Sequence, residues 1–299
     1  MKSHKKLVII NPSANSGNTQ KIVSTAHEIL RNENTIFAET SSAGHAVELA
    51  SKAGEYDMVV AIGGDGTIHE VVNGLMSIDS QERPALALVP SGSGNDTCRM
   101  AGIPLDVAEA LTISLTGSPK KFDVGMCNER YFLNSCSIGI DALVVAKTNE
   151  LKATKKLTGG LLYISALMHV VLHSLKAFNV ELSIDKSQTL KKKILLCAVT
   201  NGKTYGSGIA INPSANPADG KLSVVYIDEI SVSKTLSYLP LLAAKKHERI
   251  PEFHATNFDS LTLVSSHGTP LVAQADGEIF TDTIFEMRTI PHALDIIVT

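Results

Sequence analysis

Residues 57–75 read Asp-Met-Val-Val-Ala-Ile-Gly-Gly-Asp-Gly-Thr-Ile-His-Glu-Val-Val-Asn-Gly-Leu, and this stretch decides the fold. Met58 to Ile62 is a short apolar run rich in β-branched residues, the pattern of a strand that is buried on both faces. From Ile68 onward the apolar residues recur at helical spacing. Three glycines, an aspartate and a threonine lie between the two segments. The stretch therefore predicts a strand that turns through glycine into a helix.

Such a junction is suited to binding a phosphate group. Free backbone N–H groups and the positive end of the helix point toward the turn. Glycine also lets an anion approach the main chain closely. The pattern is neither Walker A, because no Gly-Lys-Ser/Thr follows, nor the dinucleotide fingerprint Gly-x-Gly-x-x-Gly. A glycine-rich turn that binds nothing is the alternative, and we favour the phosphate because special residues stand in a row at a strand–helix junction.

Composition excludes several classes of protein. The chain has 299 residues, of which 44% are hydrophobic, so it can form one large domain or two ordinary ones. A net charge near −3, 5% aromatic residues and no Trp argue against a nucleic-acid partner. The four cysteines show no C-x-x-C spacing and indicate reduced thiols rather than a zinc cluster. The apolar run near the N-terminus, Leu7 to Ile10, is too short for a signal peptide, so we expect a cytoplasmic protein.

The first third of the chain alternates strands and helices. Each predicted strand is followed by a loop rich in Gly, Ser, Thr or Asn, and short strands that alternate with helices imply a parallel sheet covered on both faces. Ligands of such sheets bind beyond the carboxyl ends of the strands. The loop from Pro90 to Asp96 is either structural or part of this site. The predicted strands are Leu7–Ile10, Thr35–Glu39, Met58–Ile62 and Ala85–Val89.

After about Asp123 the pattern changes to short β-type runs that fit an antiparallel sheet or sandwich. Two helices interrupt them, one over 157–177 and one from the N-cap Ser231 toward His247. We expect an α/β plus β chain of two domains: residues 1–123 form a Rossmann-like parallel α/β domain, and residues 124–299 form a mostly antiparallel β-sandwich. The last residues are a candidate segment for returning to the first domain. The predicted runs are Tyr131–Cys136, Ile194–Thr200, Leu222–Ile227, Leu261–Val264, Thr283–Met287 and Leu294–Val298.

Two groups of carboxylates in the second half are candidates for chemistry. Asp219, in a turn-rich loop, has the oxygen chemistry that a hard cation prefers, although an ordinary hairpin turn is the better interpretation from the residues alone. Asp276 and Glu278 flank a glycine, and one of them has the chemistry of a general base for a phosphoryl acceptor. Here too the residues alone favour a plain turn.

Taken together, the motifs resemble the diacylglycerol kinase catalytic-domain family, which includes bacterial lipid kinases and sphingosine kinases. The most specific match is Gly63-Gly64-Asp65-Gly66-Thr67 followed by Glu70 and Val71-Val72-Asn73-Gly74-Leu75. Asn11 to Gly17, Thr40 and Pro90 to Asp96 are similar to the family's other nucleotide loops. Asn134 to Ala142, Asp219-Gly220-x-Leu222 and Asp276-Gly277-Glu278 are similar to its later motifs. The matches cover nearly the whole chain.

The resemblance implies a set of site residues and reverses both interpretations as plain turns. It implies that Asp276 and Glu278 supply the catalytic base. It also implies a Mg²⁺ site made by Asp219 with the carbonyls of Asn216 and Lys221, which shapes the fold rather than performing the transfer. The residues implied to bind ATP are Asn11, Pro12, Ser13, Ala14, Asn15, Thr40, Gly63, Gly64, Asp65, Gly66, Thr67, Ile68, His69, Glu70 and Ser93.

Three positions depart from the family pattern. His69 stands where the signature usually has Asn, and Ser93 replaces the usual Thr but keeps a hydroxyl. Ser223 stands where many members carry a second Asp, which removes a carboxylate from the outer metal network. None of the three departures removes a proposed catalytic group.

The resemblance predicts an ATP-dependent lipid kinase that meets the membrane peripherally, with a homodimer as a further expectation. The apolar face of Leu161, Leu162, Leu167, Val170, Val171 and Leu175, with Lys152, Lys155 and Lys156 near its start, is a candidate membrane contact. An ordinary helix packed on the core is the favoured alternative. The rival functions are an NAD kinase, which shares the glycine turn, and a nucleotide-binding regulatory protein without catalysis. The sequence does not name the lipid.

Overall fold

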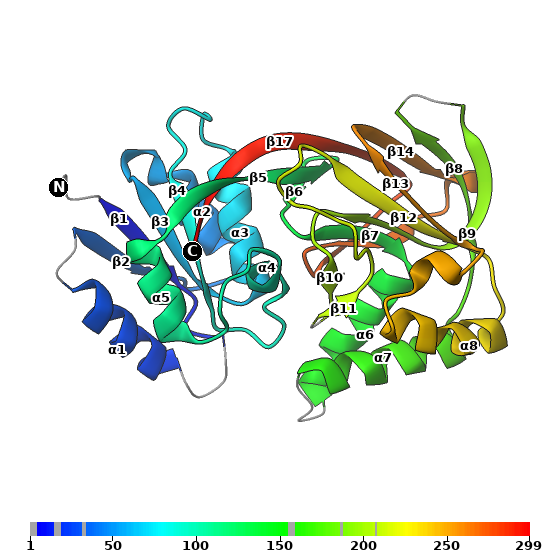
Figure 1. Cartoon of the computed structure of the whole chain (residues 1–299), viewed down its shortest axis with the longest axis horizontal. Coiled ribbons are helices and arrows are strands. Elements are labelled where there is room, and N and C mark those ends of the chain that lie inside the picture. The colour runs from blue at the N-terminus through cyan, green and yellow to red at the C-terminus, as the bar shows by residue number, and fades with distance from the viewer. Residues whose placement is uncertain (1–4, 15–18, 32–33, 155–158, 186–187, 207) are drawn as a thin grey trace. The chain divides into compact units, whose positions relative to one another are not determined.

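The computed structural model describes residues 5–14, 19–31, 34–154, 159–185, 188–206 and 208–299 (Figure 1). The chain divides into two compact units. Unit 1 comprises Met1–Val124 and Pro291–Thr299, and unit 2 comprises Gly125–Ile290. An N-terminal α/β fold with parallel strands and a C-terminal antiparallel β-sandwich are both present, so the predicted fold class is confirmed.

Unit 1 is built on a parallel sheet in the order β4-β3-β1-β2, with the end of β17 parallel to β4 at its edge. The central strands are buried along their length, which explains why they are continuous apolar runs. The helices α2 and α3 pack on each other, as do α1 and α5. The elements are β1 (Lys6–Ile10), α1 (Thr19–Leu30), β2 (Thr35–Glu39), α2 (His45–Ser51), η1 (Ala53–Glu55), β3 (Met58–Gly63), α3 (Asp65–Met76), β4 (Ala85–Pro90), α4 (Asp96–Met100), α5 (Val107–Thr116) and the start of β5 (Ser118–Cys127).

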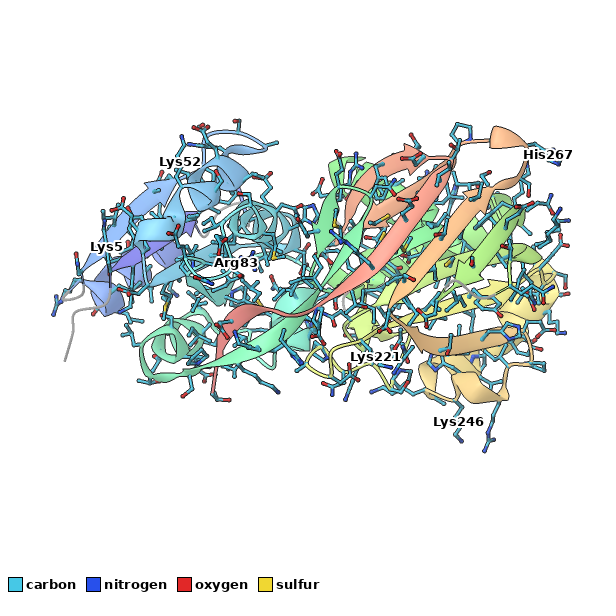
Figure 2. The ribbon with its side chains drawn as sticks, turned by 90° about the horizontal axis from the view of Figure 1, so that it is seen from above. Lys5, Lys52, Arg83, Lys221, Lys246 and His267 are labelled. Carbon is cyan, nitrogen blue, oxygen red and sulfur yellow. The ribbon has the colours of Figure 1, made fainter. Side chains whose placement is uncertain are left out.

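The edge of unit 1 is closed by contacts from residues far away in the sequence. Arg83, labelled in Figure 2, donates hydrogen bonds to the carbonyl oxygens of Leu75, Ile78 and Ala293. The fully buried carboxylate of Asp123 accepts the main-chain N–H of His292 at 2.7 Å. These contacts fix the last strand, β17 (Ile284–Val298), against the parallel sheet.

Unit 2 contains antiparallel strands and three α-helices among its described residues. The sandwich core includes Phe132, Phe258 and Phe285, all fully buried. A second apolar cluster lies where α6 and α7 cover β9, through Val144, Leu162 and Leu196. The elements are β6 (Arg130–Phe132), β7 (Ser135–Gly139), α6 (Ile140–Thr154), α7 (Gly159–His173), β8 (Phe178–Ile184), β9 (Leu190–Thr200), β10 (Thr204–Tyr205), β11 (Ile209–Ala210), β12 (Leu222–Asp228), α8 (Val232–Ala243), η2 (His247–Arg249), β13 (Phe253–Phe258), β14 (Ser260–Ser265), η3 (Ser266–Gly268), β15 (Leu271–Ala275) and β16 (Glu278–Asp282).

Three local expectations are corrected. The helix after the glycine turn begins at Asp65 rather than Ile68, so the turn itself supplies the first helical residues. The strand expected over Tyr131–Cys136 is broken between β6 and β7. The runs Thr283–Met287 and Leu294–Val298 belong to one long strand, β17, whose first part pairs with β14 and whose end pairs with β4.

Candidate active site

The nucleotide motifs of unit 1 follow adjacent strands at the same edge of the parallel sheet. Thr40 follows β2, Asn11 follows β1, Gly64 follows β3 and Ser91 follows β4. The hydrogen bonds of the sheet continue into these loops. The N–H of Thr40 donates to the carbonyl of Ile10, and the N–H of Asn11 donates to the carbonyl of Ile62. The strand order therefore places the four loops side by side, at the edge where parallel sheets bind their ligands.

The first loop is joined to the glycine turn by a side-chain hydrogen bond. Asn11 Nδ2 donates to Thr67 Oγ1 at 2.9 Å, and Asn11 Oδ1 accepts the N–H of Ser13 at 2.9 Å. Pro12 and Ser13 are exposed and Ala14 is half-buried. Asn15, also predicted to bind ATP, lies outside the described residues.

The turn after β3 touches the turn after β4 through two glycines. A Cβ on Gly92 would lie 2.5 Å from Gly64 Cα, so neither loop leaves room for a side chain at this contact. The second loop is closed by Asn95, whose Oδ1 accepts the N–H of Gly92 and whose Nδ2 donates to its carbonyl, both at 2.9 Å. Ser93 projects from this loop and is exposed.

Helix α3 begins within the glycine turn, so the N–H groups of its first turn have no acceptor inside the helix. The positive end of the helix dipole lies at the same place, which favours an anion there. Asp65 occupies the first helical position, and its Oδ1 accepts the N–H of Thr97 at 3.1 Å. The turn therefore presents N–H donors, while the carboxylate of Asp65 binds the first turn of α4.

Three of the residues predicted to bind ATP lie on helix α3 and have partners within unit 1. Glu70 accepts the N–H groups of Gly44 at 2.8 Å and Ala46 at 3.1 Å, so its carboxylate caps the N-terminus of α2. Ile68 is buried in the core, and its N–H donates to Gly64. His69, at one of the departures from the family pattern, lies one helical turn before Asn73, whose Nδ2 donates to the carbonyl of His69 at 2.9 Å.

In unit 2 the carboxylate of Asp276 is surrounded by main-chain donors. Its Oδ2 accepts the N–H of Leu133 at 2.7 Å, and its Oδ1 accepts those of Asn134 and Ser135, both at 2.9 Å. Asp276 is only 8% exposed and has a positive φ of 47°. Both carboxylate oxygens are therefore occupied by main-chain N–H donors. Asp276 thereby ties the β15–β16 turn to the residues before β7.

Glu278 differs from Asp276 in almost every respect. It is the first residue of β16 and its side chain is exposed. No group in the described part of the chain donates a hydrogen bond to its carboxylate or forms an ion pair with it. The turn therefore holds two carboxylates, one fully engaged in fixing the backbone and one available to accept a proton.

The predicted metal loop is a surface turn. Asp219 is exposed, and its Oδ1 accepts the N–H of Lys221 at 3.1 Å, which leaves Oδ2 without a hydrogen bond from the described residues. The described residues contain no cluster of three or more His, Cys, Asp or Glu side chains that would hold a metal. The donors here are one carboxylate and the carbonyls of Asn216 and Lys221, and oxygen donors of this kind fit a hard cation that keeps several waters.

Ser223, where many family members have Asp, donates to Asn257 Oδ1 at 2.7 Å and is buried. Its hydroxyl therefore belongs to the β12–β13 pair and adds no charge near Asp219.

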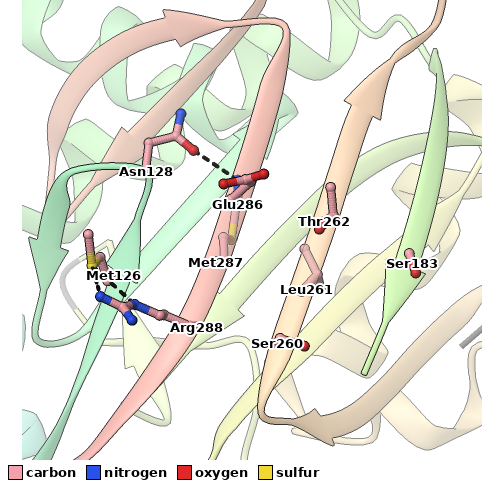
Figure 3. A pocket seen from close by; sticks show the side chains of 9 residues that line it. All are labelled: Met126, Asn128, Ser183, Ser260, Leu261, Thr262, Glu286, Met287 and Arg288. Atoms are coloured by element: carbon pink, nitrogen blue, oxygen red, sulfur yellow. Dashed lines mark hydrogen bonds between the residues drawn. The ribbon is translucent and has the colours of Figure 1, made fainter. Parts of the chain in front are cut away.

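A cavity of about 450 Å³ lies on the sheet of unit 2 (Figure 3). None of the residues predicted from the sequence as site residues lines it. Among its lining residues, Arg288 Nε and Nη2 lie 3.4 and 3.3 Å from Met126 Sδ. Its lining residues are Met126, Asn128, Ser183, Ser260, Leu261, Thr262, Glu286, Met287 and Arg288.

The predicted membrane face on α7 is only partly exposed. Leu162, Val170 and Val171 are buried, as the alternative of a core-packed helix expects. Leu161 is 72% exposed and Leu172 is 51% exposed, so an apolar stripe remains on the surface. The side chains of Lys152, Lys155 and Lys156 lie outside the described residues. No helix among the described residues is long and apolar enough to cross a membrane.

Comparison with known proteins identifies the family. The profile of the diacylglycerol kinase catalytic domain matches residues 5–127, and that of the YegS C-terminal NAD kinase β-sandwich-like domain matches residues 134–298. The chain belongs to this family of lipid kinases. It is 32% identical to a probable YegS-like lipid kinase of Chromohalobacter salexigens, over 85% of this chain and 81% of that protein. It is 31% identical to a diacylglycerol kinase of Bacillus subtilis, over 70% of this chain and 68% of that one.

Solved structures show the same fold. A putative diacylglycerol kinase from Bacillus anthracis matches with a TM-score of 0.83 at 23% identity, covering 100% of this chain and 98% of that one. An NAD kinase from Archaeoglobus fulgidus, solved in complex with ATP, matches with a TM-score of 0.56 at 12% identity, over 98% of this chain and 92% of that one. Membership of a kinase family implies the use of ATP.

Proposed function

We propose that this protein transfers the γ-phosphate of ATP to the hydroxyl group of diacylglycerol or a related lipid alcohol. The observation that supports this most directly is the pair of glycine turns in unit 1. Gly64 and Gly92 touch, and the first turn of α3 offers N–H donors beside them. Such an arrangement suits a polyphosphate. Membership of a family of lipid kinases supports a lipid as the phosphate acceptor.

We assign the role of general base to Glu278 and a positioning role to Asp276. In the proposed reaction the lipid oxygen forms a bond to the γ-phosphorus, the bond between that phosphorus and the β–γ bridging oxygen breaks, and ADP leaves. Glu278 takes the proton of the lipid hydroxyl. Its carboxylate has no competing donor among the described residues, whereas both oxygens of Asp276 accept N–H groups.

The roles in binding follow the placement of the loops. The main-chain N–H groups of Gly66 and Thr67 would contact phosphate oxygens, while Asn11 and Thr40 lie at the adjacent strand ends. Asp219, with the carbonyls of Asn216 and Lys221, would hold Mg²⁺, which when bound supplies positive charge to its loop. The exposed stripe of Leu161, Ile164 and Leu172 on α7 is our candidate for a peripheral membrane contact. A homodimer stays a prediction.

Transfer of labelled γ-phosphate to a panel of lipid alcohols in mixed micelles tests the proposal. NAD is included as an acceptor, and Glu278→Ala is assayed beside the wild type. Label in one lipid, lost in the variant, is the expected result. Label in NAD would replace the lipid assignment with the NAD kinase rival. ATP binding without transfer to any acceptor would support the regulatory rival.

A further inference from the structure

A buried carboxylate lies behind the turn that carries Glu278. Asp141, in the first turn of α6, is 5% exposed. Its Oδ1 accepts the hydroxyl of Tyr163 at 2.5 Å, and its Oδ2 accepts that of Ser137 at 2.5 Å. Donors from β7 and α7 therefore converge on one carboxylate.

The backbone at Gly139 places Asp141 in this position. Gly139 ends β7 with a φ of 97°, a conformation that favours glycine. A Cβ there would lie 2.3 Å from the ring of Phe178 and 2.6 Å from the carbonyl of Leu195. The chain thus turns sharply from β7 into α6, which brings Asp141 back beneath the strand that carries Ser137.

Gln274 links the carboxylate of Asp141 to the turn at Gly277 and Glu278. It pairs with Ser137 across β7 and β15, and its Nε2 lies 2.8 Å from Ser137 Oγ and 3.3 Å from Asp141 Oδ2. Its Oε1 accepts the N–H of Gly277 at 2.8 Å. Gly277 has a φ of 98° and immediately precedes Glu278. One side-chain amide therefore spans the distance between Asp141 and the turn.

The charge of Asp141 determines which way that amide faces. A carboxylate accepts hydrogen bonds and does not donate them, so it attracts the NH₂ end of Gln274 and repels the oxygen. The amide oxygen then faces Gly277, whose main-chain N–H is a hydrogen-bond donor. With a neutral group in place of Asp141, both orientations of the amide become possible, and in one of them Gly277 N–H faces an NH₂ group.

We infer that Asp141 is a positioning residue for the proposed base Glu278, acting through Gln274 and the N–H of Gly277. This inference rests on the proposed function. Burial raises the pKa of Asp141, so the folded chain carries an electrostatically costly group at this position. Replacing a buried polar network by apolar side chains is often neutral or stabilising, so stability alone does not require this carboxylate.

Four variants test the link, with two independent readouts. Gln274→Met removes the amide, Asp141→Asn removes the charge, and Gln274→Glu places a second acid beside Asp141. The double variant Asp141→Asn with Gln274→Glu exchanges amide and acid, so that a donor again faces an acceptor. Ser223→Ala is the matched control, because Ser223 is also buried and bonds to a side chain, Asn257, outside this network.

The first readout is hydrogen exchange at the Gly277 amide, which needs no substrate. The second is the steady-state kinetics of phosphate transfer. For Gln274→Met we expect exchange to rise about tenfold or more, and kcat to fall about 10- to 100-fold with the KM for ATP unchanged, because small misplacements of a catalytic group have effects of this size. Asp141→Asn also raises the exchange rate at Gly277 and lowers kcat. The double variant exchanges more slowly and has a higher kcat than Gln274→Glu alone. Ser223→Ala changes neither.

Several outcomes would overturn the inference. One is wild-type exchange at Gly277 in both Gln274→Met and Asp141→Asn, and another is faster exchange with unchanged kcat. If Gln274→Met does not fold, Gln274→Glu and its rescue by Asp141→Asn decide the question. If the wild type transfers phosphate to no lipid, the proposed function fails separately, and the exchange data alone decide whether Asp141 holds the turn.

Discussion

Gly64 and Gly92 meet so closely that a Cβ on Gly92 would lie 2.5 Å from the Cα of Gly64. The two residues belong to different loops, one after β3 and one after β4. The contact therefore sets the spacing of the two loops that we propose to surround the phosphates of ATP.

Gly92→Ala should push these loops apart. We expect a loss of stability of about 1–3 kcal/mol, the usual cost of overpacking, and weaker ATP binding. Thermal unfolding and ATP titration measure the two effects. Gly54→Ala is the matched control, since a Cβ at Gly54 would meet its nearest atom at an ordinary 3.7 Å. Wild-type ATP affinity in Gly92→Ala would show that the spacing of the loops is unimportant.

Glu70→Ala should destabilise unit 1 rather than only weaken ATP binding. The carboxylate accepts two N–H groups at the start of α2, and loss of a helix cap costs about 1–2 kcal/mol. Glu70→Gln keeps one acceptor and should lose less. Urea unfolding of the three proteins gives the order. Unchanged stability in both variants, with ATP binding lost, would instead indicate direct contact with the nucleotide.

Asp276→Asn and Glu278→Ala should separate stability from catalysis. In Asp276→Asn an NH₂ group faces main-chain donors, so we expect a loss of about 1–3 kcal/mol of unfolding free energy. Glu278→Ala should retain wild-type stability and lose about 10²- to 10⁴-fold in kcat. Calorimetry and the transfer assay measure both variants. The reverse pattern would make Asp276 the base.

The stability of the protein should depend on pH through Asp141. Burial raises the pKa of this carboxyl above its usual 3.8, so the folded protein holds the proton more tightly than the unfolded chain. Stability from this group is therefore present at low pH and is lost as pH rises from 3.8 through the folded pKa. The free energy of unfolding of the wild type, relative to Asp141→Asn, should fall across that window and then level off. A difference that stays constant or rises with pH would contradict this.

The four cysteines should not react with thiol reagents in the folded protein. All four are buried, and burial raises the pKa of the Cys197 thiol to about 12 and that of Cys98 as well. Because the thiolate is the nucleophile, labelling at about pH 8 should require unfolding. Rapid labelling of a native thiol would indicate local opening of the core that contains it.

The sequence predicts the parallel half of the fold well, and the reason is physical. The strands β1, β3 and β4 are buried on both faces and are continuous apolar runs with glycine, proline or asparagine at their ends, so their bounds are predicted within one residue. The half-exposed strand β2 is also predicted at Thr35–Glu39. Helix α6, in contrast, is not predicted from the sequence. It starts within the motif at Gly139–Ala142, and its apolar residues do not form a single clear stripe. The full length of β17 is also not predicted from the sequence, because Pro291 interrupts its apolar pattern.

The chemistry of the site is less accessible from the sequence. Motif matching finds Glu70, Asp276 and Glu278, but it does not show that the first two accept main-chain N–H groups from distant segments. Gln274 and Asp141 both lie in motif segments, yet the hydrogen bonds that join them exist only after β7 and β15 pair. Such roles depend on tertiary contacts, which the spacing of residues along the chain does not determine.

The return of the chain to unit 1 has a consequence for how the protein is made. The edge of the parallel sheet is completed by Pro291–Thr299, and this segment supplies the N–H of His292 to Asp123 and the carbonyl of Ala293 to Arg83. During synthesis residues 1–124 therefore leave the ribosome before the segment that contacts Asp123 and covers the sheet edge has been made. They remain without it while the whole of unit 2 is translated. Domains generally fold in the order of their synthesis. Here the sandwich can fold first, whereas the sheet of unit 1 can be completed only after Pro291–Thr299 has been synthesised.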